Sequence, residues 1–153
     1  MKEGRTYAVM GVGSVLRNDD AAGMHFADCL EKLTAGTGLT VVKGGTAPEN
    51  FTGVIKAAAP DVLFIADAAF MNQPVGTVRV LGSSQIGGMG CSTHMLPLPL
   101  TLDYLKMECG CRGVVIGIQP QNTEQGLDMC PAVEAAAEEA AKTFADLFRQ
   151  TLG

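Results

Sequence analysis

The sequence predicts an α/β protein, in which an open, mostly parallel sheet of about five strands lies between helices on both faces as a three-layer α/β/α sandwich. Short apolar runs typical of buried strands alternate along the chain with segments whose apolar residues recur at helical spacing. The chain has 153 residues, of which 47% are hydrophobic and 18% charged, so it can bury a sizeable core. We therefore expect residues 1–153 to form a single domain.

The first strand is expected at residues 6–13, where the run TYAVMGVG is almost wholly apolar and ends in glycine. Apolar positions then recur at helical spacing over residues 21–33, which predicts a helix. We expect Asp19 or Asp20 to cap this helix, because an aspartate carboxylate accepts hydrogen bonds from the N–H groups of a first helical turn.

A second short strand is expected at residues 40–43, closed by two glycines. The apolar stripe over residues 49–59 indicates a helix, and Pro60 ends it. Residues 62–67, VLFIAD, form the clearest strand pattern, a continuous apolar run that ends in the carboxylate of Asp67.

The second half of the chain continues the alternation. Residues 76–81 alternate in polarity, which indicates a strand with one wet face. Residues 82–92 are rich in glycine and serine and are expected to form a mobile loop. A helix is expected at 100–109, a buried strand at 113–118, and a long alanine-rich helix at 131–152, which begins with proline.

Composition argues against several classes of protein. The formal net charge is -5 with no basic stripe, so we expect no nucleic-acid partner. No apolar run approaches the roughly 20 residues that span a bilayer, so we expect no membrane association. The first residues lead directly into a strand pattern, and we expect a cytoplasmic protein without a signal peptide.

The five cysteines are irregularly spaced and match no paired zinc framework. Cys109 and Cys111 form a CxC sequence that fits a metal ligand pair or a strained redox pair. We favour the simpler interpretation, in which they are two small thiols in a turn of a protein from a reducing compartment.

The stretch GVGSVLRNDDAAG, residues 11–23, begins like a phosphate-binding loop, and its glycines suggest backbone packed around a ligand. Leu16 stands where a dinucleotide fingerprint needs its third glycine, and no GK[ST] sequence occurs. The adjacent carboxylates of Asp19 and Asp20 would also repel phosphate. Carboxylates at a strand end suit a cation, a proton or a hydrolytic water better.

Three polar residues follow three predicted strands. Asp20, Asp67 and His94 are expected at the carboxyl edge of the sheet, where open α/β sheets bind ligands. Two carboxylates and an imidazole can hold a divalent transition metal with open positions for water or substrate. The simpler alternative is that these residues cap or brace loops. His25 lies on the predicted first helix, and we expect it to be a surface or packing residue outside the site.

Several separated motifs together resemble one family. They are GVGSVL followed by DDAAG, then GGTAPEN, the strand that ends in Asp67, THMLPL, and GIQP. In this order they resemble the [NiFe]-hydrogenase maturation endopeptidases over nearly the whole chain. GGTAPEN, THMLPL and GIQP resemble the branch that processes the large subunit of hydrogenase 3-type enzymes.

This resemblance implies an endopeptidase that removes a C-terminal extension from a hydrogenase large-subunit precursor after nickel insertion. The implied fold is a five-stranded sheet between helices. Asp20, Asp67 and His94 would be the catalytic set and would contact nickel that the precursor carries, so nickel is not expected as a permanent prosthetic group. The implied partner is the precursor, and we expect the protein itself to be a monomer.

The sequence departs from the family pattern at two positions. Ser14 stands where the family usually has asparagine, and Ala21 where it usually has glycine. Serine has fewer hydrogen-bond donors than an amide. Alanine fits position 21 only if the backbone there does not need a positive φ.

Alternatives remain at the level of mechanism and function. Asp20 and Asp67 sharing a proton would activate water as an aspartic pair, whereas the adjacent Asp19 and Asp20 make a poor pair. Serine catalysis is disfavoured because no GxSxG elbow occurs. The protein would otherwise be a non-catalytic flavodoxin-like binding module, or a family member that binds the precursor without cleaving it.

Overall fold

The computed structural model describes residues 1, 4–82, 90–91 and 98–152 of the protein. The main sheet has the strand order β2-β1-β3-β6-β4. Its strands are β1 (Tyr7–Val12), β2 (Thr40–Gly45), β3 (Val62–Phe70), β4 (Val78–Gly82) and β6 (Arg112–Ile118). All neighbours pair in parallel except β4, which is antiparallel to β6. The sheet is therefore mostly parallel, as predicted.

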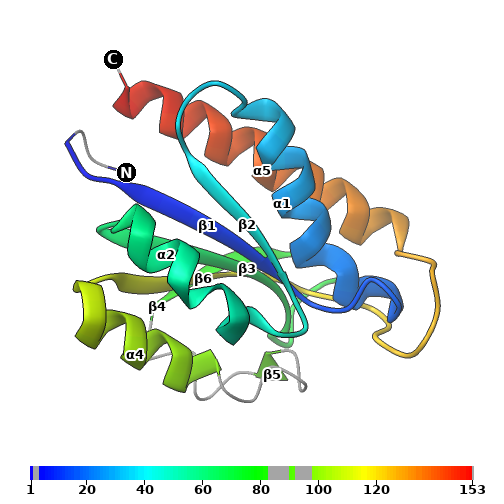
Figure 1. The fold of residues 1–153 in the computed structure, drawn as a ribbon. Coiled ribbons are helices and arrows are strands. Elements are labelled where there is room, and N and C mark those ends of the chain that lie inside the picture. Colours follow the sequence, from blue (N-terminus) through cyan, green and yellow to red (C-terminus); the bar gives the residue numbers. More distant parts are fainter. Residues whose placement is uncertain (2–3, 83–89, 92–97, 153) are drawn as a thin grey trace.

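Helices cover both faces of this sheet, with α1 and α5 on one face and α2 and α4 on the other (Figure 1). The helices are α1 (Ala22–Leu33), α2 (Thr52–Ala58), α4 (Leu98–Cys109) and α5 (Pro131–Thr151). Short 3-10 turns, η1 (Asn18–Ala21) and η2 (Pro48–Phe51), precede α1 and α2. The predicted three-layer sandwich is confirmed. Among the described residues, no helix combines the length and apolar character needed to cross a membrane.

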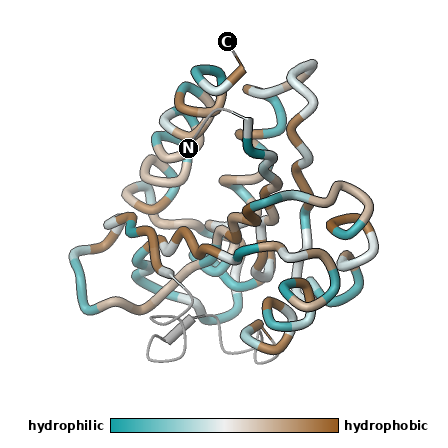
Figure 2. The backbone as a smooth tube through the Cα atoms, turned by 90° about the vertical axis from the view of Figure 1, so that its left-hand side faces the viewer, coloured by the Kyte–Doolittle hydropathy of each residue, from teal (hydrophilic) through white to brown (hydrophobic). Residues whose placement is uncertain are grey.

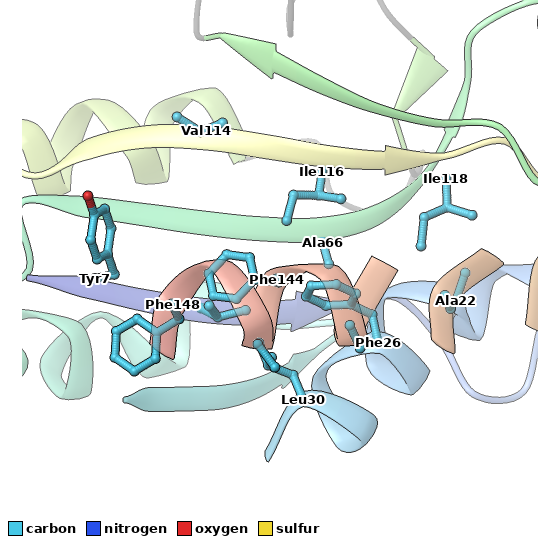
Figure 3. Packing of buried hydrophobic residues seen from close by; sticks show 14 of the residues in the cluster. Tyr7, Ala22, Phe26, Leu30, Ala66, Val114, Ile116, Ile118, Phe144 and Phe148 are labelled. Carbon is cyan, nitrogen blue, oxygen red and sulfur yellow. The ribbon is translucent and has the colours of Figure 1, made fainter. Parts of the chain in front are cut away.

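Two apolar clusters fill the spaces between the layers. Hydrophobic stretches of the chain gather in the middle of the molecule (Figure 2). On the α1/α5 face, the Phe144 ring lies edge-on to Phe64 and Phe26, with ring centroids 5.0 and 6.2 Å away. Figure 3 shows Phe144 and Phe26 in this cluster. Edge-to-face pairs at this spacing are favourable beyond the area they bury. On the other face, Ile55 of α2 and Leu105 of α4 are buried against the sheet.

Two strands differ from the sequence prediction. β3 does not end at Asp67 but continues to Phe70, because it keeps pairing with β6 as far as Ala68 and then pairs antiparallel with a short strand, β5 (Gly90–Cys91). β4 is an edge strand on which Val80 is 64% exposed, in keeping with the wet face predicted for it. The predicted loop over residues 82–92 falls largely on positions 83–89 and 92, outside the described residues.

Candidate active site

The candidate site lies at the carboxyl ends of β1 and β3. After β1 the chain passes through α1 to β2 on one side, whereas after β3 it continues towards β4 and β6 on the other. Open α/β sheets have a crevice at such a switch point, and ligands bind there. Asp20 follows β1 in η1, and Asp67 lies on β3.

Asp20 is held in place by the loop that follows β1. Its side chain is buried, and the residue is 2% exposed. The Ser14 N–H donates a hydrogen bond of 2.8 Å to Asp20 Oδ2. The Asp20 N–H in turn donates to the Arg17 carbonyl at 2.9 Å. These contacts fix the direction of the carboxylate before any substrate arrives.

The glycines of the opening motif pack against the chain's own backbone, which corrects the interpretation that they enclose a ligand. Gly13 has φ +127, and a Cβ there would lie 2.0 Å from the Asp20 carbonyl oxygen. A Cβ on Gly11 would lie 2.4 Å from the Gly23 carbonyl oxygen. The absence of side chains therefore lets η1 and α1 lie directly on the sheet.

Asp67 is fully buried, at 0% exposure. It lies opposite Gly117 of β6, one residue beyond the point where the pairing of β1 with β3 ends. Side chains alternate along a strand, so Asp67 lies on the same face as Leu63 and Ile65, the face that α2 and α4 cover. Burying a carboxylate inside an apolar sheet costs free energy, and such residues concentrate at functional sites.

One close contact brings the two carboxylate-bearing segments together. A Cβ on Gly23 would lie 2.2 Å from the Ala66 carbonyl oxygen. Gly23 follows Asp20 by three residues, and Ala66 directly precedes Asp67. The start of α1 therefore lies against β3 next to Asp67, and both aspartates stand at the same switch point.

His94, the third residue expected at the site, lies outside the described residues, which resume at Leu98. Its place in the site remains the prediction made from the sequence. The donor set formed by Asp20 and Asp67 consists of carboxylate oxygens, which suit a divalent cation and would repel phosphate.

Neither of the two adjacent aspartates caps α1, so that prediction is wrong. The N-cap residue is Ala21, without a side-chain hydrogen bond, because the 3-10 turn η1 continues directly into the helix. The Asp19 carboxylate accepts three backbone N–H groups instead, from Gln121 at 2.8 Å, Asn122 at 2.9 Å and Cys130 at 2.6 Å. Asp19 therefore anchors the segment between β6 and α5, which we call the 119–130 loop.

Asn18 fastens the same loop and was not anticipated from the sequence. It adopts a left-handed backbone conformation with φ 46, which asparagine tolerates better than most residues. Its Nδ2 donates to the Glu124 carbonyl at 2.9 Å, and its Oδ1 accepts the Asp128 N–H at 3.0 Å. One feature of the sequence could have indicated this role, namely a short amide side chain placed beside two aspartates where a tight turn is expected.

Gln119 is a second positioning residue that sequence reasoning did not single out. It belongs to the GIQP motif at the end of β6 and is buried. Its Oε1 accepts the Met71 N–H at 2.6 Å, and its Nε2 donates to the Pro120 carbonyl at 3.1 Å. Gln119 thus links the end of β6 to the segment that follows β3.

The structure accommodates both departures from the family pattern. Ala21 has φ -76, so the position does not require glycine. Ser14 holds Asp20 through its backbone N–H, a contact that does not depend on the side chain. The Ser14 hydroxyl oxygen accepts the Leu16 N–H at 3.2 Å and stabilises the loop locally.

The CxC cysteines have structural surroundings. Both thiols are free, and Cys111 is buried in the core on the α2/α4 face. The Cys109 thiol donates to the Leu105 carbonyl at 3.2 Å. Burial raises the pKa of the Cys111 thiol to about 11, so it is protonated at neutral pH. These features agree with the interpretation of two reduced thiols in a turn.

Large apolar side chains are exposed on the loops that carry the site. Val15 is 55% exposed and Leu16 63%, and Leu127 on the 119–130 loop is 79% exposed. The Gly126 N–H donates to the Leu16 carbonyl at 2.9 Å, which places Leu16 and Leu127 on adjacent stretches of chain. Exposed apolar residues gathered on one surface are typical of protein-binding sites.

A separate cavity of about 560 Å³ lies between β4 and α5. Its lining is apolar, with Phe64, Val78 and Ile116 among the residues, and it contains neither Asp20 nor Asp67. Among the described residues that line it, Glu139 is the one acidic side chain. This cavity lacks the convergent polar groups that a catalytic site needs.

The fold and the site define an α/β protein in which the buried carboxylates of Asp20 and Asp67 stand at the switch point of the sheet. The sequence profile of the family described as hydrogenase maturation protease matches residues 24–147. The chain belongs to this family. Asp67 and His94 fall inside the matched range, and Asp20 precedes it.

Individual relatives agree with this assignment. A putative hydrogenase maturation protease of Methanocaldococcus jannaschii is 30% identical over 141 residues, which cover 88% of this chain and 81% of that protein. The hydrogenase 3 maturation protease of Escherichia coli is 34% identical over 116 residues, covering 75% and 73%. The crystal structure of the [NiFe] hydrogenase maturation protease HycI from Thermococcus kodakarensis superposes with a TM-score of 0.86 at 29% identity, covering 95% and 94%.

Proposed function

We propose that this protein is an endopeptidase that removes the C-terminal extension of a [NiFe]-hydrogenase large-subunit precursor after nickel insertion. The observation that carries the proposal is the pair of carboxylates, Asp20 and Asp67, buried at one switch point of a fold shared with hydrogenase maturation proteases. The membership of the family supports the peptidase activity. The exposed apolar residues beside the site suit a protein-sized substrate.

In this proposal nickel arrives as part of the substrate and contacts Asp20, Asp67 and His94. Carboxylate oxygens and an imidazole nitrogen are suitable ligands for a divalent transition metal. A carboxylate accepts several hydrogen bonds or metal contacts, so Asp20 can keep its bond to the Ser14 N–H while meeting a cation. Docking of the metal would place the scissile peptide bond beside both aspartates.

This arrangement would make cleavage a checkpoint for nickel insertion. Buried negative charges need compensation, and a divalent cation would supply it at this site. A precursor without nickel offers no such cation. We therefore expect unloaded precursors to be spared.

Two routes remain for the activation of water. In one, the substrate's nickel lowers the pKa of a bound water, as metal ions do in hydrolytic enzymes. In the other, Asp20 and Asp67 share a proton and one carboxylate acts as the general base. The first route uses the negative charge of Asp20 to hold the metal, and the second uses its carboxyl group as one member of the acid–base pair.

The substitution Asp20→Asn tests the role of that charge. It keeps the size and most hydrogen-bonding capacity of the side chain but removes the anion. We expect processing of the nickel-loaded precursor to fall by at least about 100-fold, the contribution of a positioned acid–base group. The rate of release of the C-terminal fragment, followed by mass spectrometry, measures the effect.

Asp103→Asn is the matched control, because Asp103 is an exposed aspartate on α4. We expect this variant to cleave at the wild-type rate, and both variants to unfold near the wild-type urea midpoint. A folded Asp20→Asn protein that cleaves normally would contradict the assignment. Binding of the precursor without cleavage by the wild-type protein would instead favour the non-cleaving alternative.

A further inference from the structure

Four side chains with metal-binding atoms meet where α1 packs on α5, away from Asp20 and Asp67. His25 and Cys29 lie one turn apart on α1, and Glu134 and Glu138 lie one turn apart on α5. Residues four positions apart share one face of a helix, so each helix presents two ligands to the other. The sequence predicts a surface or packing role for His25, and the structure places it at this junction, with its side chain 29% exposed.

Donor atoms of three of these side chains, His25, Glu134 and Glu138, have the spacing of ligands around one ion, and the Cys29 sulfur adjoins them at His25. His25 Nε2 lies 3.5 Å from Glu138 Oε2 and 3.8 Å from Cys29 Sγ. Ligand atoms of His25, Glu134 and Glu138 all lie within 4.8 Å of one another. Tetrahedral zinc bonds of about 2.0–2.3 Å place nitrogen about 3.4 Å from oxygen and about 3.6 Å from sulfur. An N–H···O hydrogen bond is shorter, at about 2.7–3.2 Å.

One imidazole nitrogen is shared by two neighbours in this cluster. The same imidazole nitrogen, Nε2, faces both the Glu138 carboxylate and the Cys29 sulfur. One ring nitrogen carries at most one proton, so it cannot donate a well-aligned hydrogen bond to both. A cation bound by His25 Nε2 and the Glu138 carboxylate would remove this competition, and rotation of the Cys29 side chain would add the sulfur as a further ligand.

We propose that His25, Cys29, Glu134 and Glu138 bind one divalent transition-metal ion of the zinc class. Imidazole and thiolate ligands select zinc, cobalt or nickel over magnesium and calcium, which prefer all-oxygen sites. The two glutamates supply the negative charge that a dication requires. Glu134 is exposed, so its carboxylate has room to move by about an ångström into the first coordination sphere.

Metal binding at this site would join α1 to α5 through all four side chains. The Cys29 thiol would form a sulfur–metal bond and release its proton to the solvent. The site uses none of the residues of the candidate active site, and it does not depend on the proposed peptidase function. The bound metal would hold α1, the helix that directly follows the η1 turn carrying Asp20.

The direct test is a cobalt titration of the full chain after removal of metals with a chelator. The protein carries Asp20→Asn and Asp67→Asn, which remove the carboxylate donors of the candidate active site. We expect one Co²⁺ per chain and a thiolate-to-cobalt charge-transfer band. Calorimetry with Zn²⁺ should give the same stoichiometry.

Single substitutions added to this background separate the proposed site from other binding. His25→Gln and Glu138→Gln should each weaken binding by tenfold or more, and Cys29→Ser should abolish the charge-transfer band. Glu139→Gln, on the adjacent exposed residue of α5, and Cys109→Ser should leave both unchanged. If the background variant does not fold, His25→Gln in the wild-type chain should remove one Co²⁺ equivalent.

Three results would overturn the proposal. They are no cobalt binding in the folded background variant, binding that His25→Gln leaves unchanged, and binding without a thiolate charge-transfer band. The first two would leave His25 and Glu138 as an ordinary ion pair between helices. The third would exclude Cys29 and with it the four-ligand site.

Discussion

At the scale of the residue, the site depends on glycines that allow close contact between backbone segments. Gly23 lets α1 approach β3 until a Cβ would lie 2.2 Å from the Ala66 carbonyl oxygen and 2.5 Å from that of Val12. Both neighbours are backbone atoms of the sheet, so they cannot turn aside as a flexible side chain would. Any side chain at position 23 must move the helix.

We expect Gly23→Ala to lower the free energy of unfolding by about 3 kcal/mol or more, at the upper end of the effects of overpacking. Because the displacement would also shift η1, processing activity should fall further than the loss of folded protein explains. Urea denaturation and cleavage assays on the folded fraction measure the two effects.

Gly53→Ala is the control for this prediction. Gly53 lies in α2, a Cβ there would meet no atom within 4 Å, and alanine favours helix. We expect that variant to be as stable as the wild type or up to about 1 kcal/mol more stable. Equal stability of the two variants would refute the close-packing role of Gly23.

The positions of Asp20 and Asp67 at the carboxyl edge of the sheet were predictable, whereas the partners of the neighbouring polar residues were not. Asp20 and Asp67 stood out because each interrupts or follows an apolar run at a predicted strand end. The function of Asp19 was missed, because its partners lie more than 100 residues away in the 119–130 loop. Asn18 and Gln119 were missed for the same reason, since sequence spacing does not reveal hydrogen bonds between distant loops.

At the scale of the element, the 119–130 loop is fastened to η1 chiefly by Asn18 and Asp19. Three backbone N–H groups of the loop and of the start of α5 share the Asp19 carboxylate. Substitution by asparagine would turn an NH₂ group towards at least one of these donors. A buried donor without an acceptor costs about 1–3 kcal/mol.

We therefore expect Asp19→Asn to lower the free energy of unfolding by about 2 kcal/mol. Limited proteolysis should cut the 119–130 loop faster than in the wild type. Asp128→Asn, at an exposed position of the same loop, should change neither quantity. Unaltered proteolysis of the Asp19→Asn protein would show that the carboxylate does not hold the loop.

Helices and strands were largely predictable because their patterns are local. The helix expected at 131–152 is α5 (Pro131–Thr151), and the strand expected at 113–118 lies within β6 (Arg112–Ile118). The errors concern tertiary pairing. β3 extends past Asp67 because it continues to pair there with β6 and then with β5. The sequence of residues 68–70 alone does not indicate those partners.

At the scale of the whole molecule, the loops that hold Asp20 also present an apolar surface. Leu16 and Leu127 are 63% and 79% exposed, and the chain segments that carry them are hydrogen-bonded to each other. Burial of one leucine contributes ~1.5–3 kcal/mol to binding. A large precursor protein that covers these residues would gain that contribution.

We expect the double substitution Leu16→Ser and Leu127→Ser to raise the KM for the precursor by about tenfold or more, with kcat and the melting temperature little changed. Leu152→Ser, directly after the end of α5, removes another exposed leucine (56%) outside these loops and should have no effect on KM. Unchanged KM in the double variant would mean that the precursor binds elsewhere.

The titration of the Cys111 thiol makes the free energy of unfolding depend on pH in the alkaline range. Burial raises the pKa of its thiol from 9.0 to about 11 in the folded protein, so the folded state favours the protonated form. The resulting stabilisation is complete below about pH 9 and is lost as the pH rises towards 11. We expect the free energy of unfolding to fall across this range.

Cys111→Ala should be less stable at neutral pH, because it leaves a small cavity, but should lose less of its remaining stability between pH 9 and 11. Urea denaturation at several pH values measures both slopes. Parallel curves for the two proteins would show that the titration of Cys111 does not contribute.

The central claim is that cleavage requires nickel in the substrate. The most direct measurement is incubation of the protein with a hydrogenase large-subunit precursor from the same source, prepared with and without nickel, followed by mass spectrometry. We expect release of a C-terminal fragment from the nickel-loaded precursor only, and its loss in the Asp20→Asn variant. Equal cleavage of both precursor forms, or cleavage of neither, would contradict this claim.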